Sequence, residues 1–237
     1  MDSASYATLS RQVGLWREMS IVANNIANSA TNGYRQEGLV FSEYIKADPG
    51  GRSLSMGNGN IQNTSFTQGA LTETGGTFDF AIEGEGFFLV ETPMGERLTR
   101  AGSFSPNAEG DLVTHDGLRV LDIGGAPVFV PPDAGNIAVA ADGTISADGR
   151  LLGQLGVVRP LDPGGMTRED GVMFVAEAGF EPDDTSRVLQ GFVENSNVDA
   201  VTALARMIEV QRAYELGQSF LDSEDQRVRS ALSSLSK

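Results

Sequence analysis

Every proline in this chain lies in its middle, and this placement limits where long helices can form. The nine prolines fall between Pro49 and Pro182, and 24 of the 29 glycines lie within residues 47–190. Proline removes a backbone donor and glycine weakens a helix, so both residues favour turns. The sequence therefore predicts three parts: an N-terminal helix with its connecting segment (1–46), a Gly/Pro-rich acidic middle domain (47–190) and a C-terminal helix (191–237).

The charged residues follow the same division, and their distribution limits which partners the chain can bind. Residues 47–190 carry 21 acidic and 8 basic side chains, so −13 of the net charge of −15 lies there. Such acidity argues against nucleic acid as a partner. The chain has no cysteine, which excludes a disulfide framework and thiolate metal sites. No secretory signal pattern and no apolar run of membrane-spanning length is found, so we expect no direct membrane insertion.

The first 30 residues carry apolar side chains at helical spacing on two stripes. One is a seam with alternating spacings of three and four, and it contains Leu9, Val13, Trp16 and Ala23. The other lies about 110° round the helix and contains Leu15, Met19, Val22 and Ile26. A helix that is apolar on two sides is normally buried by more than one neighbour.

The last 40 residues carry a seven-residue repeat. Its members at a spacing of seven include Met207, Tyr214, Leu221 and Val228, and a second row contains Leu204, Gln211 and Gln218. The side chains of residues 195–197 (Asn-Ser-Asn) can cap the first turn. A sustained heptad repeat favours supercoiling around a partner helix. We therefore expect the two terminal helices to pair as a coiled coil. The alternative is an ordinary amphipathic helix packed on its own domain.

The middle domain has the pattern of antiparallel β structure. Short apolar runs alternate with turn signals, and three of these are Asp-Gly pairs suited to hairpins, at 116–117, 142–143 and 148–149. Evenly spaced short strands favour a meandering sheet or a small barrel. The predicted fold class is therefore α+β, with N- and C-terminal helices pairing as a coiled coil and a mainly antiparallel β middle domain.

No catalytic constellation is apparent. The single histidine, His115, lies in a predicted turn without a serine or cysteine partner, and Asp142 and Asp148 lack the order of a calcium loop. Spacing alone does not exclude a glycosidase-like carboxylate pair, although a solvated acidic surface explains the carboxylates more simply. We predict no catalytic, cofactor-binding or metal-binding residue, no cofactor and no enzymatic activity.

Two terminal motifs carry a family resemblance. The segments "IVANNIANSATNGYRQ" (21–36) and "ENSNVDAVTALARMIEVQRAYEL" (194–216) resemble the N- and C-terminal signatures of the flagellar rod and hook axial proteins. The segments "AIEGEGFF" (81–88) and "LTRAGSFSPNAEGDLVTHDG" (98–117) are similar to the family's shared β region. Within this family, the short length and the segment at 131–149 are most typical of a proximal-rod member.

The resemblance implies a structural role. Family members pair their terminal helices in the inner layer of a helical tube, with the β region outside. It implies a subunit of the basal-body proximal rod, an axle that transmits motor torque to the hook. The implied partners are copies of the chain, other rod proteins and the flagellar type III export apparatus, with export to the periplasmic rod without a cleaved signal peptide. Alternatives are a distal-rod or hook member, or a secreted β-rich glycan-binding or adhesin module.

The same reasoning selects assembly residues. We expect subunit packing by the apolar side chains of the two helices: Leu9, Val13, Trp16, Met19, Val22, Ala23, Ile26, Leu204, Met207, Ile208, Tyr214, Leu221 and Val228. We expect four amides to set register between subunits, because a buried amide without a partner is costly: Asn25, Asn28, Gln211 and Gln218. Before assembly, the two ends are expected to be partly disordered.

Overall fold

The computed structural model describes residues 3–47 and 53–235, with side chains at 8–40 and 63–234. The chain divides into two compact units. The first, here called the helical unit, contains residues 1–29, 36–66 and 198–237, and the second, the β unit, contains residues 30–35 and 67–197. The sequence division places residues 47–66 in the middle domain, whereas in the structure they group with the terminal helices.

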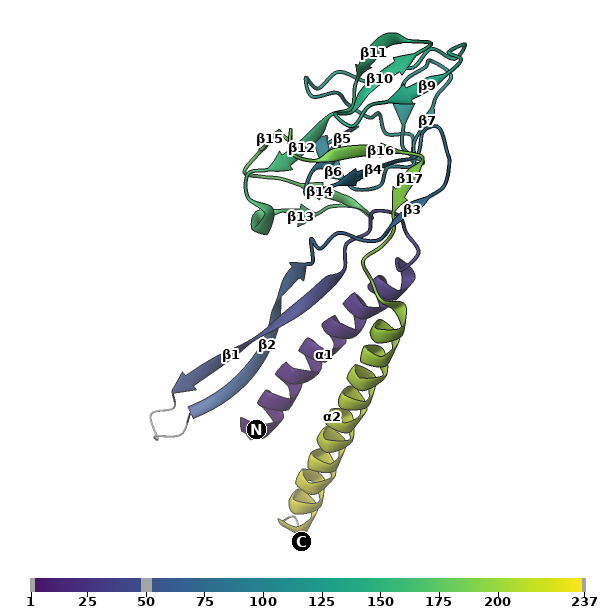
Figure 1. The fold of residues 1–237 in the computed structure, drawn as a ribbon. Helices are drawn as coiled ribbons and strands as arrows, with labels where there is room; N and C mark the ends of the chain where they lie inside the picture. Colours follow the sequence, from purple (N-terminus) through teal and green to yellow (C-terminus); the bar gives the residue numbers. More distant parts are fainter. Residues whose placement is uncertain (1–2, 48–52, 236–237) are drawn as a thin grey trace. The chain divides into compact units, whose positions relative to one another are not determined.

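The helical unit consists of two helices and one hairpin. Its elements are α1 (Ser3–Ala27), β1 (Glu37–Ala47), β2 (Ser53–Thr64) and α2 (Ala200–Leu235). β1 and β2 pair antiparallel, with a register shift between Val40 and Phe41. α1 lies between the hairpin and α2 and contacts both (Figure 1). α1 therefore has more than one neighbour, as the sequence predicts, although one of its two apolar stripes stays exposed.

The coiled-coil part of the fold prediction is wrong. α1 packs on a hairpin as well as on a helix, and its predicted seam is not the packed face: Leu9, Val13 and Trp16 are exposed. The buried face carries Leu15 and Val22 from the other stripe. Three polar side chains share that buried face: Gln12, Glu18 and Asn25. Because they interrupt its apolar pattern, apolar periodicity identified the wrong face as the packed one. The α+β class itself is supported.

The buried face of α2 is likewise displaced by one residue from the predicted row. Ala203 and Val210 are buried, whereas Leu204 and Gln211 beside them are exposed. Half-buried Gly217 lies seven residues further along the same row, and a Cβ built there would lie 2.0 Å from Nε2 of Gln12. The absence of a side chain at Gly217 lets α2 approach α1 closely at this point.

The start of α2 is fixed by a residue other than those predicted. The Oδ1 atom of Asp199 accepts hydrogen bonds from the N–H groups of Val201 and Thr202, both at 2.9 Å. This is the geometry of a helix N-cap. The prediction of a cap at residues 195–197 is therefore wrong, and the amide of Asn197 instead donates to the carbonyl oxygen of Thr67.

The β unit is built of short antiparallel strands around one six-stranded sheet (Figure 1). In spatial order this sheet contains β13 (Thr167–Arg168), β14 (Met173–Val175), β6 (Gly95–Thr99), β5 (Phe87–Thr92), β12 (Val157–Pro160) and β15 (Phe180–Pro182). A three-stranded sheet follows the order β11 (Arg150–Gln154), β10 (Thr144–Ala147), β9 (Ile137–Val139). Three two-stranded pairs complete it: β16 (Arg187–Gln190) with β4 (Phe80–Glu83), β17 (Phe192–Glu194) with β3 (Leu71–Glu73), and β7 (Ser105–Pro106) with β8 (Leu112–Val113).

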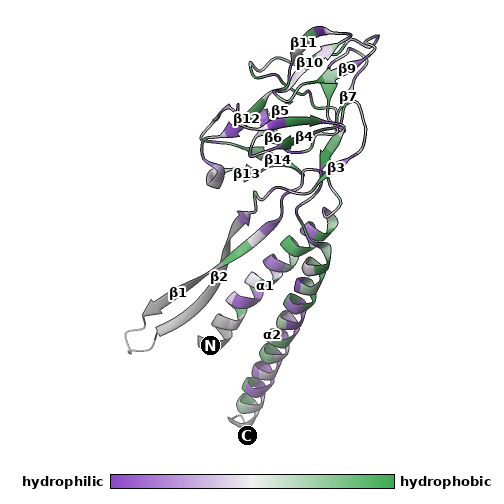
Figure 2. Ribbon diagram, viewed as in Figure 1, coloured by the Kyte–Doolittle hydropathy of each residue, from purple (hydrophilic) through white to green (hydrophobic). Residues whose placement is uncertain are grey.

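One apolar core holds these small sheets together. Phe104 packs edge-on against Phe88, with ring centroids 5.3 Å apart, and lies 6.1 Å from the ring of Phe80. Ile145 of β10 and Val188 of β16 are buried in the same cluster. β4 supplies Phe80 and Ile82 to this core and β5 supplies Phe88 and Val90, and Figure 2 shows hydrophobic colouring on β4.

The predicted antiparallel turns are confirmed. Asp148 and Gly149 join β10 to β11 with positive φ angles of 49° and 80°, as an Asp-Gly hairpin turn requires. Gly143 has a φ of 83° in the turn before β10. Within the described residues, neither helix is long and apolar enough to cross a membrane.

Candidate subunit-packing surface

Exposed apolar side chains gather on the two helices. Of the sixteen large apolar side chains exposed among the described residues, three lie on α1 and seven on α2. Those on α1 are Leu9, Val13 and Trp16, spaced by four and three residues, and the tryptophan side chain is 62% exposed. An apolar stripe exposed along a helix is typical of a surface that packs against another protein.

α2 presents exposed apolar side chains along its length, with Leu216 and Phe220 in its middle. Val201, Leu204 and Ile208 form an exposed stripe near its start, with Leu204 55% exposed. Val228 and Leu232 are exposed near its end. Figure 2 shows the resulting alternation of hydrophobic and hydrophilic colour along the whole of α2. Seven of the predicted packing residues thus remain accessible to a neighbour: Leu9, Val13, Trp16, Ala23, Leu204, Ile208 and Val228.

The other predicted packing residues are wholly or half buried within the described structure. Val22 is buried, and five are half-buried: Met19, Ile26, Met207, Tyr214 and Leu221. Met207 and Tyr214 lie on the same side of α2 as buried Ala203 and Val210. The face of α2 predicted from the heptad repeat is therefore partly buried within the chain itself.

Polar contacts fix how α1 and α2 meet inside the helical unit. Nε2 of Gln12 donates to the backbone oxygen of Tyr214 at 2.9 Å. Two nitrogens of Arg206 contact Oε1 of Glu18, at 2.6 and 2.7 Å, although this glutamate is largely buried. Because Gln12 meets residue 214 and Glu18 meets residue 206, the helices run antiparallel.

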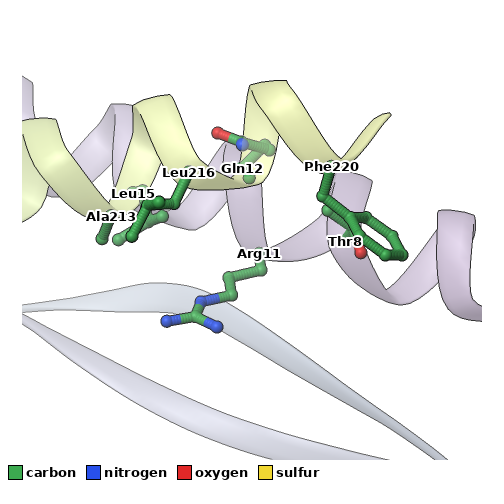
Figure 3. A pocket seen from close by; sticks show the side chains of 8 residues that line it. Thr8, Arg11, Gln12, Leu15, Ala213, Leu216 and Phe220 are labelled. Carbon is green, nitrogen blue, oxygen red and sulfur yellow. The ribbon is translucent and has the colours of Figure 1, made fainter. Parts of the chain in front are cut away.

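A cavity of about 320 Å³ lies beside the Gln12 contact. Figure 3 shows Leu15, Ala213 and Leu216 gathered on one side of Gln12, and Thr8 with Phe220 on the other. Oε1 of Gln12 is buried and accepts no hydrogen bond from the described residues. The packing of the two helices is therefore incomplete at this level.

The predicted register amides occupy different environments. Asn25 is 2% exposed and exchanges two hydrogen bonds with the backbone of Glu37: its Nδ2 donates to the carbonyl at 2.7 Å, and its Oδ1 accepts from the N–H at 2.9 Å. It therefore ties the end of α1 to the start of β1 within one chain. Asn28 donates to Asn24 one turn earlier. Gln211 and Gln218 are exposed on α2.

A buried charged cluster lies where the two signature motifs meet in the β unit. The Glu194 carboxylate contacts two guanidinium groups, with Oε1 2.5 Å from Nη1 of Arg35 and Oε2 3.1 Å from Nη1 of Arg100. Its Oε1 also accepts from the N–H of Gly69 at 2.8 Å. The side chains of Arg35 and Glu194 are completely buried.

Burial governs the titration of both arginines. Loss of hydration lowers the pKa of Arg100 to about 10, against the opposing attraction of Glu194. The same loss of hydration lowers the pKa of Arg35, again opposed by Glu194. The cluster holds two cations against one carboxylate, and backbone carbonyls supply further acceptors: Thr67 for Arg35, and Gly84 for Arg100.

Backbone contacts join the same two segments. The N–H of Gly33 donates to the carbonyl of Glu194 at 2.7 Å, and that of Asn197 donates to the carbonyl of Tyr34 at 3.3 Å. Gly33 has a φ of 72°, and a Cβ there would lie 2.3 Å from the backbone nitrogen of Ala101. Only glycine fits this position.

Sequence reasoning missed this cluster, because no spacing rule links residue 35 to residue 194. Both residues belong to the segments that carry the family resemblance, and that was the one available signal. Within the described residues, no group of three or more His, Asp or Glu side chains could hold a metal ion. His115 is exposed.

Comparison with known proteins identifies the family. The family model described as "Flagellar hook protein FlgE/F/G D1 domain" matches residues 81–147, which lie in the β unit. A second family model, described as "Flagellar basal body rod FlgEFG protein C-terminal", matches residues 189–234, which include α2 up to Ser234.

Whole-chain relatives agree with these matches. The flagellar basal-body rod protein FlgF of Caulobacter vibrioides is 39% identical over all of this chain and 99% of its own length. FlgF of Mesorhizobium japonicum is 37% identical, over 91% of this chain and 90% of its own. The basal-body rod protein FlgG of Bacillus subtilis is 29% identical, over 93% of this chain and 94% of its own. The chain therefore belongs to the FlgE/F/G family of flagellar rod and hook proteins and is, among these relatives, most similar to FlgF.

Proposed function

We infer that this chain is a structural subunit of the flagellar basal-body rod. The observation that carries this inference is the exposed apolar surface of both terminal helices, in a chain whose full-length relatives are named basal-body rod proteins. A monomer gains nothing from an exposed Trp16 or Leu204, whereas a neighbour that covers them gains apolar burial. The proposed role is mechanical and involves no reaction.

The proposed assembly uses the accessible members of the packing set. Each subunit buries Leu9, Val13 and Trp16 on α1, and Leu204 and Ile208 on α2, against helices of neighbours. Burying one such side chain contributes about 1.5–3 kcal/mol. Because each contact repeats in every subunit, the summed burial makes a stiff axle that can transmit torque to the hook.

Polar residues set the register of this packing. Gln211 and Gln218 lie exposed on α2 a heptad apart, and Gln211 donates to Glu215 one turn later at 3.1 Å. An amide that a neighbour buries without a partner would penalise misaligned packing. Asn28, half-buried near the end of α1, is proposed for the same role. Asn25 is assigned to holding α1 against β1, because both of its amide atoms already bond to Glu37.

The proposed location is the proximal rod in the periplasm. Similarity to FlgF relatives supports this placement, with other rod proteins and further copies of the chain as neighbours. We further propose delivery by the flagellar type III export apparatus without cleavage of a signal peptide. Passage through an export channel requires an unfolded chain, and helices that become fully buried only on assembly suit that route.

Quantitative mass spectrometry of purified hook–basal bodies from the source bacterium tests the proposal. A few copies per basal body are expected for a proximal-rod subunit. Many copies would move the chain to the distal rod or hook. Absence from basal bodies, with abundance in soluble fractions, would overturn the rod assignment.

A further inference from the structure

One surface of the β unit is not used by its own fold. Two open cavities of about 500 and 390 Å³ adjoin one another and share four lining residues: Asp116, Leu118, Asp170 and Met173. Together they form what is here called the acidic groove. Cavities of this size suit the side chains of a bound segment.

The acidic groove combines unpaired negative charge with an apolar lining. Within the described residues, the carboxylates of Asp116 and Asp170 accept no hydrogen bond and form no ion pair, and both line both cavities. The one arginine of the groove, Arg97, is already paired with Glu169. The apolar part comes from Leu118 and Met173, with Met94 76% exposed at the rim. The fitting occupant is a cationic side chain next to an apolar one.

The same chain carries such a pair at the β10–β11 turn. Arg150 and Leu151 follow the turn directly, Leu151 is 73% exposed, and the guanidinium of Arg150 has no partner within the described residues. The turn is held rigidly, because Asp148 accepts from the N–H groups of Gly135 and Asn136, at 3.3 and 3.0 Å. A rigid protrusion loses little entropy on binding.

The protrusion and the groove belong to different parts of the β unit. β10 and β11 lie at one end of this unit, and β13 and β14, whose connecting turn contributes Asp170, lie at the other (Figure 1). The protrusion therefore cannot fill the groove of its own chain. A contact between one surface patch and a different patch on the next copy is heterologous, and its repetition generates open helical assemblies.

We propose that the Arg150–Leu151 protrusion of one subunit docks into the acidic groove of a second copy of this chain. This inference rests on the proposed rod function and adds a contact between β units to the packing of the helices. Arg150 pairs with Asp116 and Asp170, since a guanidinium donates readily to carboxylates. Leu151 is covered by Met94, Leu118 and Met173.

Cross-linking between engineered cysteines tests the contact, and the natural absence of cysteine makes the background clean. Full-length Leu151→Cys is mixed at high concentration with full-length Met94→Cys and oxidised. The matched control partner is Leu161→Cys, at an exposed apolar position that lines neither cavity. The Met94 variant is expected to form the mixed dimer about fivefold faster than the control.

Charge exchange gives a second readout on the same pair. Arg150→Glu in the Leu151→Cys chain is expected to slow formation of the mixed cross-link about fivefold. Adding Asp116→Lys and Asp170→Lys to the Met94→Cys chain is expected to restore the original rate, because the charges are then complementary again. Arg187→Glu, a reversal at an exposed arginine of β16, is expected to change nothing.

Two results would overturn the inference. One is equal cross-linking of the Met94 and Leu161 variants. The other is a groove cross-link that forms in purified basal bodies only with a different protein. Either result leaves the rod assignment intact, since that assignment fails only if the chain is absent from basal bodies.

Discussion

Arg35 and Glu194 form a completely buried ion pair, with Nη1 of the arginine 2.5 Å from Oε1 of the glutamate. The pair joins the chain segment that follows α1 to the segment that precedes α2, so both ends of the β unit are fastened at one point. Arg100 shares the carboxylate, and Arg168 donates to the backbone carbonyl of Arg35 at 2.5 Å.

Removing this carboxylate should severely destabilise the β unit. Glu194→Gln leaves two buried guanidinium groups without a counter-charge, and breaking a buried pair typically costs about 3–5 kcal/mol. Urea unfolding followed by circular dichroism measures the loss. The control is Glu181→Gln, whose partner Arg159 is half-exposed like itself, so a cost below about 1 kcal/mol is expected. Equal unfolding midpoints for the two variants would refute a structural role for the cluster.

The N-cap of α2 should make its first turn sensitive to acid. Hydrogen bonds from the N–H groups of Thr202 and Val201 lower the pKa of Asp199 below its ordinary value of 3.8. The stabilisation is therefore complete above pH 3.8 and is lost as the pH falls through the lower folded-state value. Amide exchange at Val201 and Thr202 across this range measures it. Asp199→Asn keeps a capping oxygen without a titrating group, and an unchanged acid response in this variant would contradict the assignment.

Asn25 should stabilise the junction of α1 and β1 in the isolated chain. Asn25→Ala leaves the N–H and C=O of Glu37 without these partners, and an unsatisfied buried group costs about 1–3 kcal/mol. We expect faster hydrogen exchange at the Glu37 amide. Asn24→Ala, one residue earlier, removes only an exposed acceptor for Asn28 and is the control, expected to change stability by less than about 0.5 kcal/mol. If Asn25→Ala changed neither stability nor exchange at Glu37, the side chain would have no role in the fold of the isolated chain, and its role would be limited to contacts between subunits.

Neighbouring residues of α1 should separate folding from assembly. Leu15 is 8% exposed, so Leu15→Ala is expected to destabilise the helical unit by about 2–5 kcal/mol. Trp16→Ala removes a larger but exposed side chain, and its effect on the monomer should stay within about 0.5 kcal/mol. Thermal unfolding of both purified variants makes the comparison. A Trp16 variant as unstable as the Leu15 variant would show that the tryptophan is part of the fold.

The sequence predicted those features that depend on local rules. Proline and glycine placement separated the helices from the β region, and the Asp-Gly pair at 148–149 forms the hairpin turn expected of it. The faces of the helices were harder to predict. Buried Gln12, Glu18 and Asn25 break the apolar stripe of α1, while exposed Val13 and Trp16 imitate one.

Other features depend on partners that no periodicity reveals. The predicted heptad row of α2 contains Gln218, but the residue that lies close to α1 is its neighbour Gly217. The ion pair of Arg35 with Glu194 forms between segments that meet only in the folded chain. Asp199 caps α2 because Asn195 and Asn197 donate to Thr72 and Thr67 of the β unit instead.

The most direct test of the packing surface is competition between wild-type chain and Trp16→Ala chain for the same rods. Both are produced at equal levels in one cell, and mass spectrometry of purified basal bodies measures their ratio through the peptide that contains residue 16. A strong excess of wild type in basal bodies, with equal amounts of both chains exported, is the predicted result. An equal ratio in basal bodies would contradict the claim that the exposed apolar face of α1 packs against neighbouring subunits.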